Sequence, residues 1–313
     1  MASTEHFRQL SVQDLRGSAA RRRKERTVGA IFLAGAAVSV VISVGIVAAL
    51  IGEALNFALT VDVGQLVTDG WFPRRDMFDI STIVAGTLLV SVIGMVIAAP
   101  LGLGAAIYLA EYASPRVRKI LKPILEILAG IPSVVLGFFA LTFISPIVVD
   151  RVCPGSTPVF NMASAGIAVG ILITPLVASI AEDAMHAVPN SLREASYGLG
   201  AKRQATSLRI VVPAAVSGIV AALIIGLSRA IGETMIVAIA AGAAGGSLFN
   251  LNPCQPGQVM TAAMTSLATG SDQVRGASLA FPSLFFVGLL LFFITLALNL
   301  ISEGFVRRVR VSY

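Results

Sequence analysis

The sequence predicts an all-α integral membrane protein with six transmembrane helices. Hydrophobic residues make up 56% of the 313 residues and charged residues only 13%, whereas a soluble domain carries about 25% charged residues. Six apolar runs are long enough, at roughly 20 residues or more, to cross the hydrocarbon core of a bilayer as helices. Most basic residues lie in alternate segments between these runs, which is the charge pattern of a multi-pass membrane protein.

The six predicted spans follow one another along the chain, and proline or glycine interrupts several of them. Pro100 lies in the second span and Pro175 in the fourth. The third contains Gly130-Ile131-Pro132-Ser133, where we expect a kink for packing. The fifth run is longer than a bilayer is thick, so its helix must protrude, tilt or break. The spans are expected at about 28–51, 80–110, 123–149, 163–181, 214–244 and 281–301.

The distribution of positive charge orients these spans. Of the 23 lysines and arginines, 18 lie in 1–27, 111–122, 182–213 and the C-terminal tail. Positive residues mark the cytoplasmic side, so both termini are predicted to be cytoplasmic. We expect a basic cytoplasmic tail at 1–27, a six-helix transmembrane domain at 28–302 and a second basic cytoplasmic tail at 303–313.

The net charge of +6 is explained by this topology and by contact with anionic lipid headgroups. We therefore expect no nucleic-acid partner. The first residues include Phe7, Leu10 and Leu15, which fit either a short interfacial helix or a disordered tail.

The two cysteines lie in different outer loops. Cys153 precedes Pro154-Gly155, and Cys254 lies in the turn-rich sequence NPCQPG. Because both are predicted on the non-cytoplasmic side, we expect them to form a disulfide in an oxidising compartment. Two unpaired thiols are the alternative. Two lone cysteines do not predict a metal site.

The cytoplasmic segment 182–213 is predicted to fold as a helix–glycine–helix elbow. Ser191 would cap the first helix, with Glu194 three residues later in capping-box spacing. This helix would stop at Gly200, and a second helical segment would lead through Pro213 into the fifth span.

The elbow resembles the EAA loop of ABC importer permeases. Glu194-Ala195-Ser196 is followed after three residues by Gly200, after nine more by Ile210 and after two more by Pro213. The family has alanine where this chain has Ser196. The resemblance implies the type I (MetI-like) permease architecture and a loop that docks into a groove of a separate ATPase subunit. An elbow without a partner is the alternative.

The charged residues of the elbow would offer ion pairs to the ATPase subunit. The residues that we assign to ATPase coupling are Arg193, Glu194, Ala195, Gly200 and Pro213, with Lys202 and Arg203 beside them. The phosphate-cradling pattern G-x-x-x-x-G-K-[ST] occurs nowhere in the chain. We expect no enzyme activity and no cofactor on this chain, with ATP and Mg²⁺ bound by the partner ATPase.

Three stretches narrow the resemblance to one kind of importer. GIPSVVLGFFAL at 130–141, EASYGLGAKR at 194–203 and SRAIGETMIVA at 228–238 resemble permease subunits of the bacterial phosphate-specific (Pst) ABC importer, PstC-type more than PstA-type. The resemblance covers roughly residues 28–310. The PstA-like subunit, or a permease for another oxyanion such as sulfate or molybdate, is the alternative.

This resemblance implies a set of partners. Inorganic phosphate would come from an external phosphate-binding protein and pass through a heterodimer with a second homologous permease subunit. Two ATPase subunits would drive transport, and the complex would lie in the bacterial cytoplasmic membrane.

Arg229 and Glu233 are the only charged residues in the fifth run. A charged side chain near the bilayer centre costs about 2.5–3.5 kcal/mol on insertion scales, so both need an explanation. At i and i+4 of one helix they would share a face and pair. Gly226 and Gly232 permit a close approach or a break around them.

Two interpretations of this pair stay open. It is either a buried ion pair that holds the helix to a neighbour, or a substrate station. In the second, Arg229 offers charge-assisted donors to an anion and Glu233 holds Arg229 when the anion is absent. Ser228, Thr234 and Ser133 would lie along the same pathway. By resemblance, the second permease subunit contributes a similar arginine.

The sequence also permits a transporter or channel that works without an ATPase. A secondary transporter or channel would use the Arg–Glu pair as a proton or ion relay, and the EAA-like loop would be a coincidence. An intramembrane enzyme has less support, because the sequence lacks paired histidines, a metal-ligand cluster and a nucleophile beside a base.

Overall fold

A computed structural model describes residues 19–68, 70–153, 158–242, 245–269 and 279–309, without the side chains of residues 19, 21, 22 and 307–309. The chain divides into two compact units, one up to Leu50 and one from Ile51 onward, and each is described by itself. The interfacial helix considered for Phe7, Leu10 and Leu15 lies outside the described residues.

The described part of the first unit belongs to helix α1 (Ala19–Thr60), which continues into the second unit. Its segment Arg23–Thr60 is long and apolar enough to cross a membrane. The helix extends beyond the predicted 28–51 at both ends. At its start this happens because alanine, arginine, lysine and glutamate favour helix, so part of the predicted tail is helical.

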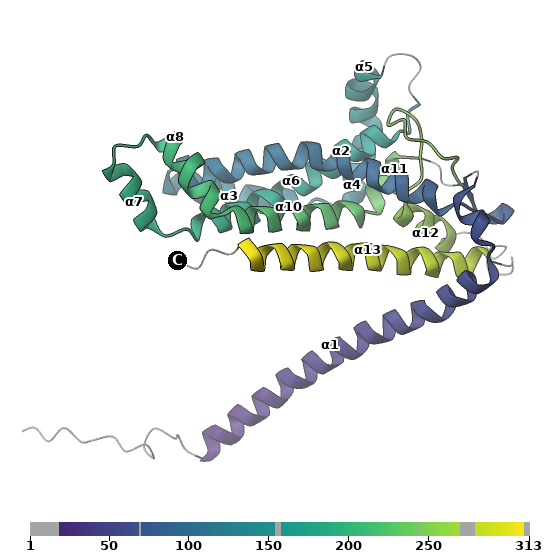
Figure 1. Cartoon of the computed structure of the whole chain (residues 1–313), viewed down its shortest axis with the longest axis horizontal. Helices are drawn as coiled ribbons and strands as arrows, with labels where there is room; N and C mark the ends of the chain where they lie inside the picture. Colours follow the sequence, from purple (N-terminus) through teal and green to yellow (C-terminus); the bar gives the residue numbers. More distant parts are fainter. Residues whose placement is uncertain (1–18, 69, 154–157, 243–244, 270–278, 310–313) are drawn as a thin grey trace, which may run out of the picture. The chain divides into compact units, whose positions relative to one another are not determined.

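The second unit is a helical bundle with one small hairpin (Figure 1). In chain order its 3₁₀ helices and strands are η2 (Val63–Val67), β1 (Trp71–Phe72), η3 (Pro73–Arg75) and β2 (Met77–Phe78). Its α-helices and π-helical segments follow as α2 (Ile80–Ile107), η4 (Tyr108–Tyr112), α3 (Pro115–Ala129), α4 (Ser133–Phe139), η5 (Ala140–Val149), α5 (Asp150–Val152), α6 (Met162–His186), α7 (Asn190–Gly198), α8 (Arg203–Thr206), η6 (Ser207–Val211), α9 (Val212–Ala214), α10 (Val216–Ile231), α11 (Met235–Ala240), α12 (Met260–Ala268) and α13 (Ala280–Val309).

Four long helices, α2, α6, α10 and α13, lie side by side in this bundle (Figure 1). Helices α2 and α6 approach closely, since a Cβ added at Gly170 would lie 2.7 Å from the carbonyl oxygen of Gly94. Small residues at the crossing therefore let the two backbones touch, as helix packing in membranes favours. Val90, Val169 and Ile173 fill the core beside this crossing.

The two ends of the bundle carry different structures (Figure 1). The helices α7 and α8 project at one end, and the hairpin lies at the other. In the hairpin Trp71 pairs with Phe78, and Trp71 also bridges Ser247 in a later loop. Cys153 and Cys254 form a disulfide with Cα atoms 6.1 Å apart, which is the pairing predicted from the sequence.

The six predicted spans correspond to the upper of two possible counts. Among the described residues, five helices are long and apolar enough to cross a membrane. A sixth is obtained if Arg203–Ala214 and Val216–Ile231, which meet at an angle of 71°, form one span. The chain is an all-helical membrane protein apart from its short hairpin.

The predicted start of the third span is wrong. Residues 123–129 belong to α3, a separate amphipathic helix that also covers much of the predicted loop 111–122. The span begins at Ser133. The chain breaks instead of kinking because Gly130 caps α3 and Pro132, at the N-cap of α4, has no backbone N–H to donate.

The fifth run breaks, which is one of the three outcomes expected from its length. Helix α10 ends at Ile231, and α11 begins at Met235. Helix α12 was not predicted, because its 9 residues are too few to meet the length criterion for a span.

Candidate substrate pathway and coupling site

Arg229 lies in the last turn of α10, directly before the break in the fifth run. Gly232 N donates to Ser228 O and Glu233 N donates to Ala230 O, each at 3.2 Å. These two hydrogen bonds close the helix. Glu233 therefore lies beyond the helix end and does not share a helical face with Arg229.

The side chains of Arg229 and Glu233 have different surroundings. Arg229 is exposed on the surface of the single chain, whereas Glu233 is buried. Glu233 Oε1 accepts from Ile236 N at 3.5 Å, and its backbone oxygen accepts from Thr261 Oγ1 at 2.7 Å. No hydrogen bond or ion pair joins Glu233 to Arg229 in the described chain. The predicted i, i+4 pair is wrong because the helix ends between the two residues.

Three hydroxyl groups were predicted along the same pathway. Ser228 Oγ is buried, and within the described residues it has no hydrogen-bond partner. Thr234 Oγ1 donates to Gly232 O at 3.3 Å, inside the break itself. Ser133 begins α4, which packs against α11, but no described contact joins it to Arg229. Ser228 thus lies just before the break, Thr234 lies within it, and Ser133 lies on another helix.

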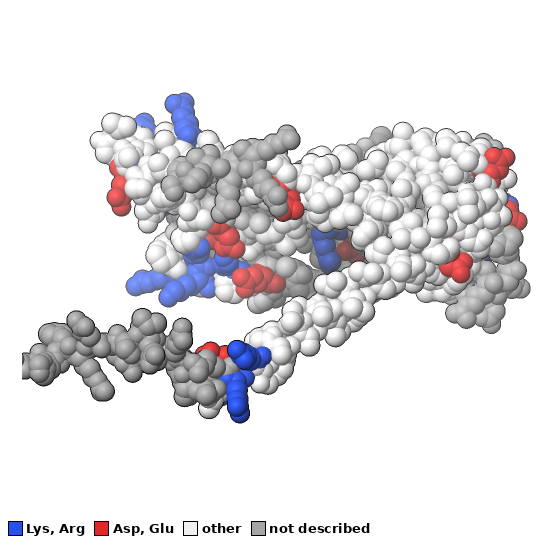
Figure 2. Space-filling model, turned by 60° about the horizontal axis from the view of Figure 1, so that its bottom comes forward, with Lys and Arg blue, Asp and Glu red and all other residues white. Residues whose placement is uncertain are grey.

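Charged side chains are sparse along the middle of the bundle. In Figure 2 most lysines, arginines, aspartates and glutamates lie towards its ends, and uncharged residues cover most of the surface between. Few charged groups lie between the ends on the face that Figure 2 shows, so an exposed guanidinium on α10 is a distinct local feature.

The elbow, predicted at 182–213, has the predicted helix–glycine–helix form, and its helical segments run from α7 to α9. Gly200 has a φ of +78°, and its N–H donates to Tyr197 O at 2.9 Å. A left-handed glycine after a helix is the usual C-terminal cap. The N-terminal part of the prediction is wrong, since Pro189 occupies the N-cap without a side-chain hydrogen bond and Ser191 lies inside α7.

A buried hydrogen bond joins the two arms of the elbow. Ser196 Oγ on α7 and Thr206 Oγ1 on α8 are 2.8 Å apart, and both residues are buried. The serine that replaces the family's alanine therefore has a structural partner. At the tip between the arms, Leu199 is 90% exposed.

Some of the residues assigned to ATPase coupling are exposed, and one of them points into the protein. Glu194 and Ala195 are exposed on the outer side of α7, and Pro213 is exposed just before the bend into α10. Arg193 points inward instead. Its charge is committed to Glu111, so the expectation that it offers an ion pair to a partner surface is not supported by the position of its side chain.

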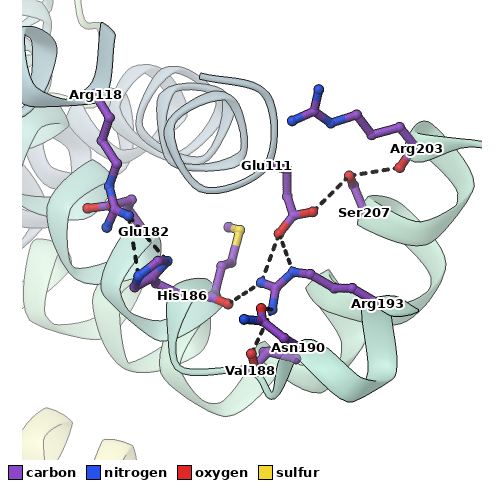
Figure 3. A network of polar contacts seen from close by, with 10 residues as sticks. Glu111, Arg118, Glu182, His186, Val188, Asn190, Arg193, Arg203 and Ser207 are labelled. Carbon is purple, nitrogen blue, oxygen red and sulfur yellow. Dashed lines mark hydrogen bonds and ion pairs between the residues drawn. The ribbon is translucent and has the colours of Figure 1, made fainter. Parts of the chain in front are cut away.

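Glu111, at the end of the second span, was not singled out from the sequence. Its side chain is buried and accepts from Arg193 Nε at 3.1 Å and Nη2 at 2.9 Å (Figure 3). Ser207 Oγ also lies 3.4 Å from its Oε2. The available signal was a lone carboxylate directly after a span, beside a segment rich in cations.

A second ionic cluster joins α3 to α6. Buried Glu182 pairs with Arg118 and, at 2.8 Å, with Lys122, which also binds Asp183 at 2.7 Å. Arg118 Nη1 lies 3.3 Å from the ring nitrogens of His186 (Figure 3). Hydrogen bonds to Asp183 and Glu182 raise the pKa of Lys122 above its ordinary value of 10.5, so it is charged at physiological pH.

Within the described residues, no group of three or more histidines, cysteines, aspartates or glutamates is placed to hold a metal ion. The polar clusters near the elbow are ion pairs and hydrogen bonds between protein groups. Their arrangement is suited to holding helices together.

Comparison with known proteins identifies the family to which this chain belongs. Residues 98–311 match the family model described as "Binding-protein-dependent transport system inner membrane component". Among curated proteins, the chain is 32% identical over 267 residues to the phosphate transport system permease protein PstC 1 of Mycobacterium tuberculosis, covering 78% of this chain and 77% of that one. It is 30% identical over 256 residues to PstC of Pasteurella multocida, covering 76% and 78%.

A shorter match is to the probable ABC transporter permease protein YqgH of Bacillus subtilis. The identity is 36% over 179 residues, and the match spans 56% of this chain and 57% of YqgH.

Solved structures share the fold. A chain of a bacterial alginate ABC transporter crystallised with an alginate-bound periplasmic protein superposes with a TM-score of 0.64 at 17% identity, covering 94% of this chain and 99% of that one. A chain of the MetNI methionine ABC transporter, in an inward-facing conformation, gives a TM-score of 0.50 at 19% identity, covering 74% and 94%. The chain therefore belongs to the family of binding-protein-dependent transport system inner membrane components, as the multi-pass permease, and not the ATPase, of a bacterial ABC importer.

Proposed function

We propose that this chain is the PstC-like permease subunit of an ATP-driven phosphate importer. It would receive inorganic phosphate from an external binding protein and pass it across the membrane with a second, homologous permease subunit. Its membrane domain would cover residues 28–302, with both tails in the cytoplasm. Two ATPase subunits, which bind ATP and Mg²⁺, would drive the cycle. The names of the PstC relatives support phosphate as the substrate.

The exposed side chain of Arg229 carries this proposal. In an apolar segment an exposed guanidinium without a carboxylate partner among the described residues needs a role, and a phosphate anion would supply the missing charge. Arginine suits this role because its planar fork binds oxyanions through two parallel hydrogen bonds. With a similar arginine from the second permease subunit, it would form a transient binding point for phosphate.

Glu233 has a different role from the one first expected. Since it is buried and contacts α11 and α12, it would shape the break and not neutralise Arg229. A break in a membrane helix leaves backbone groups unpaired, which is tolerated where they line a polar path or are buried in protein. The position of Arg229 at this break supports a path there.

Phosphate uptake by reconstituted complexes tests the substrate station. Arg229→Gln should abolish uptake while the complex still assembles and is still stimulated to hydrolyse ATP. Arg151→Gln is the matched control because it removes an exposed arginine from α5, at the end of a span and away from the break. Normal phosphate uptake by Arg229→Gln would show that Arg229 is not a binding point for phosphate.

The same assay separates the remaining alternatives. Sulfate or molybdate uptake in place of phosphate would identify another oxyanion permease. Uptake without any ATPase subunit would indicate a channel or secondary transporter. Strict dependence on ATP, the ATPase and phosphate supports the proposal.

The exposed outer side of α7 supports the elbow as the ATPase contact. Glu194→Ala should lower transport-linked ATP hydrolysis several-fold, because it removes an exposed charge from the proposed interface. ATP hydrolysis and co-purification of the ATPase are both measured for this variant and for Ser191→Ala, an exposed position on the same helix. Equal recovery of the ATPase in both would contradict the contact.

A further inference from the structure

We infer that Glu111 is a positioning residue that ties the elbow to the cytoplasmic ends of two long helices, so that movement of α7 is passed to both helices together. This inference rests on the proposed role of the elbow as the ATPase contact. The set of groups involved, called the clasp, consists of Glu111, Arg193, Ser207 and the backbone oxygens of Met185 and Val188 (Figure 3).

Arg193 is the centre of the clasp. Its Nε and Nη2 donate to Glu111 Oε1, at 3.1 and 2.9 Å. Nη2 also donates to Met185 O at 2.9 Å, and Nη1 donates to Val188 O at 2.6 Å and to Asn190 Oδ1 at 3.3 Å. The guanidinium has five N–H donors, and these contacts provide an acceptor for each. A side chain held in this way has little freedom to turn towards a partner.

The carboxylate of Glu111 completes the clasp from the other side. It follows α2, which packs against α6 and α10, and Ser207 on the return arm of the elbow approaches its second oxygen. One carboxylate thus joins the end of α2, the helix α7 and the segment η6. The side chains of Glu111 and Arg193 are 3% and 14% exposed. Removing one partner of such a buried pair leaves the other charge without compensation, which is strongly destabilising.

The clasp changes how the elbow can move. The segment between α6 and α7 could act as a hinge, but Arg193 binds carbonyl oxygens at the end of α6 and in this very segment. The inner face of α7 is therefore fixed to α2 and α6, while Glu194 and Ala195 on its outer face are exposed. A push on the outer face would be transmitted as a movement of the helix ends instead of being absorbed by the linker.

The neighbouring cluster around Glu182 supplies a matched control. Glu182 is also buried and paired with two cations at the same end of the bundle. It joins α3 to α6 and makes no described contact with α7. Loss of Glu182 should therefore affect stability without uncoupling the elbow.

The experiment compares Glu111→Gln with Glu182→Gln in the complete importer, reconstituted with its ATPase subunits and binding protein. Inorganic phosphate transported per ATP hydrolysed is measured. Glu111→Gln should lower this ratio about fivefold or more, at the low end of typical couplings between sites, with ATP hydrolysis itself retained. Glu182→Gln should leave the ratio unchanged. An unchanged ratio in Glu111→Gln, or an equal fall in both variants, would overturn the clasp.

A covalent tether tests positioning directly. Glu111→Cys with Arg193→Cys should lower the ratio, and a short bifunctional thiol reagent that links the two positions should restore it. Failure of the link to restore coupling would contradict a purely mechanical role. If Glu111→Gln does not assemble, Arg193→Lys is measured instead, because it keeps the charge but loses the fork, and an unchanged ratio there rejects the clasp.

The wild-type complex distinguishes this inference from the proposed function. If wild type shows no ATP-dependent phosphate transport, the proposed function fails. If wild type is coupled and Glu111→Gln is equally coupled, only the clasp fails.

Discussion

Ser196 shows how one residue can depart from a family pattern and gain a contact. Where the EAA loop has alanine, this chain has a hydroxyl 2.8 Å from Thr206 Oγ1. A net hydrogen bond of this kind contributes about 1 kcal/mol. The two arms of the elbow are thereby joined at a second point besides the peptide chain at Gly200.

Ser196→Ala should loosen the elbow by about 1 kcal/mol without changing the fold, because it leaves Thr206 without this side-chain partner. Amide hydrogen exchange of α7 measures the change, and faster exchange is expected. Ser191→Ala serves as the control, since Ser191 is exposed on the same helix. Equal protection in the two variants would show that the buried hydroxyl pair contributes nothing to the elbow.

At the scale of elements, two glycines of the elbow differ in whether their backbone conformation requires glycine. Gly200 adopts a φ of +78°, and a Cβ there would meet nothing within 4 Å. The requirement at Gly200 is thus conformational and not steric. Gly198 also has open space around it, but it lies within α7.

Gly200→Ala should destabilise the elbow by about 1 kcal/mol, because L-residues disfavour the left-handed region. Gly198→Ala should be neutral or stabilising by up to about 1 kcal/mol, because alanine favours helix. Recovery of the ATPase subunit with each variant gives the readout. Lower recovery of the ATPase with Gly198→Ala than with Gly200→Ala would mean that the turn is not needed for docking.

The crossing of α2 and α6 depends on backbone contact. Gly170→Ala would place a Cβ 2.7 Å from Gly94 O and 3.0 Å from Ile97 Cβ, and overpacking of this kind costs about 1–3 kcal/mol. A lower thermal unfolding midpoint in detergent is expected. Gly104→Ala on α2 is the matched control, because a Cβ there would meet no atom within 4 Å. An equal fall of the unfolding midpoint in this variant would show that close packing at Gly170 is not the cause.

At the scale of the whole molecule, the sequence predicted the helical spans better than local geometry. Hydropathy depends on composition over many residues, so most of the spans could be predicted from single apolar runs. The start of the third span could not, because Gly130 and Pro132 together permit either a kink or a break. The pairing of Arg229 with Glu233 required a continuous helix, and the helix ends between them.

The long-range contacts of the elbow were the least predictable part. Glu111 and Arg193 are 82 positions apart in the chain, and no local pattern connects them. The disulfide could be predicted because only two cysteines exist and the predicted topology places both on one side. With many carboxylates and many arginines, the sequence offers no such restriction.

The disulfide joins loops 101 positions apart, and closing a long loop restricts the unfolded chain. Reduction should therefore lower stability by about 2–4 kcal/mol. The unfolding midpoint with and without reductant measures this effect. The double variant Cys153→Ser, Cys254→Ser should be insensitive to reductant, and a wild type equally insensitive would show that the bond adds no stability.

The uncovered Leu199 at the tip of the elbow bears on how the cell controls subunit numbers. Burying a leucine side chain is worth about 1.5–3 kcal/mol relative to leaving it in water, and this one is 90% exposed in the single chain. A copy synthesised in excess would keep that apolar side chain in the aqueous phase, open to chaperones and proteases that recognise unassembled proteins. Degradation of orphan copies should then be slower for Leu199→Ser than for wild type, so the tip that is proposed to dock would also report whether the ATPase is bound.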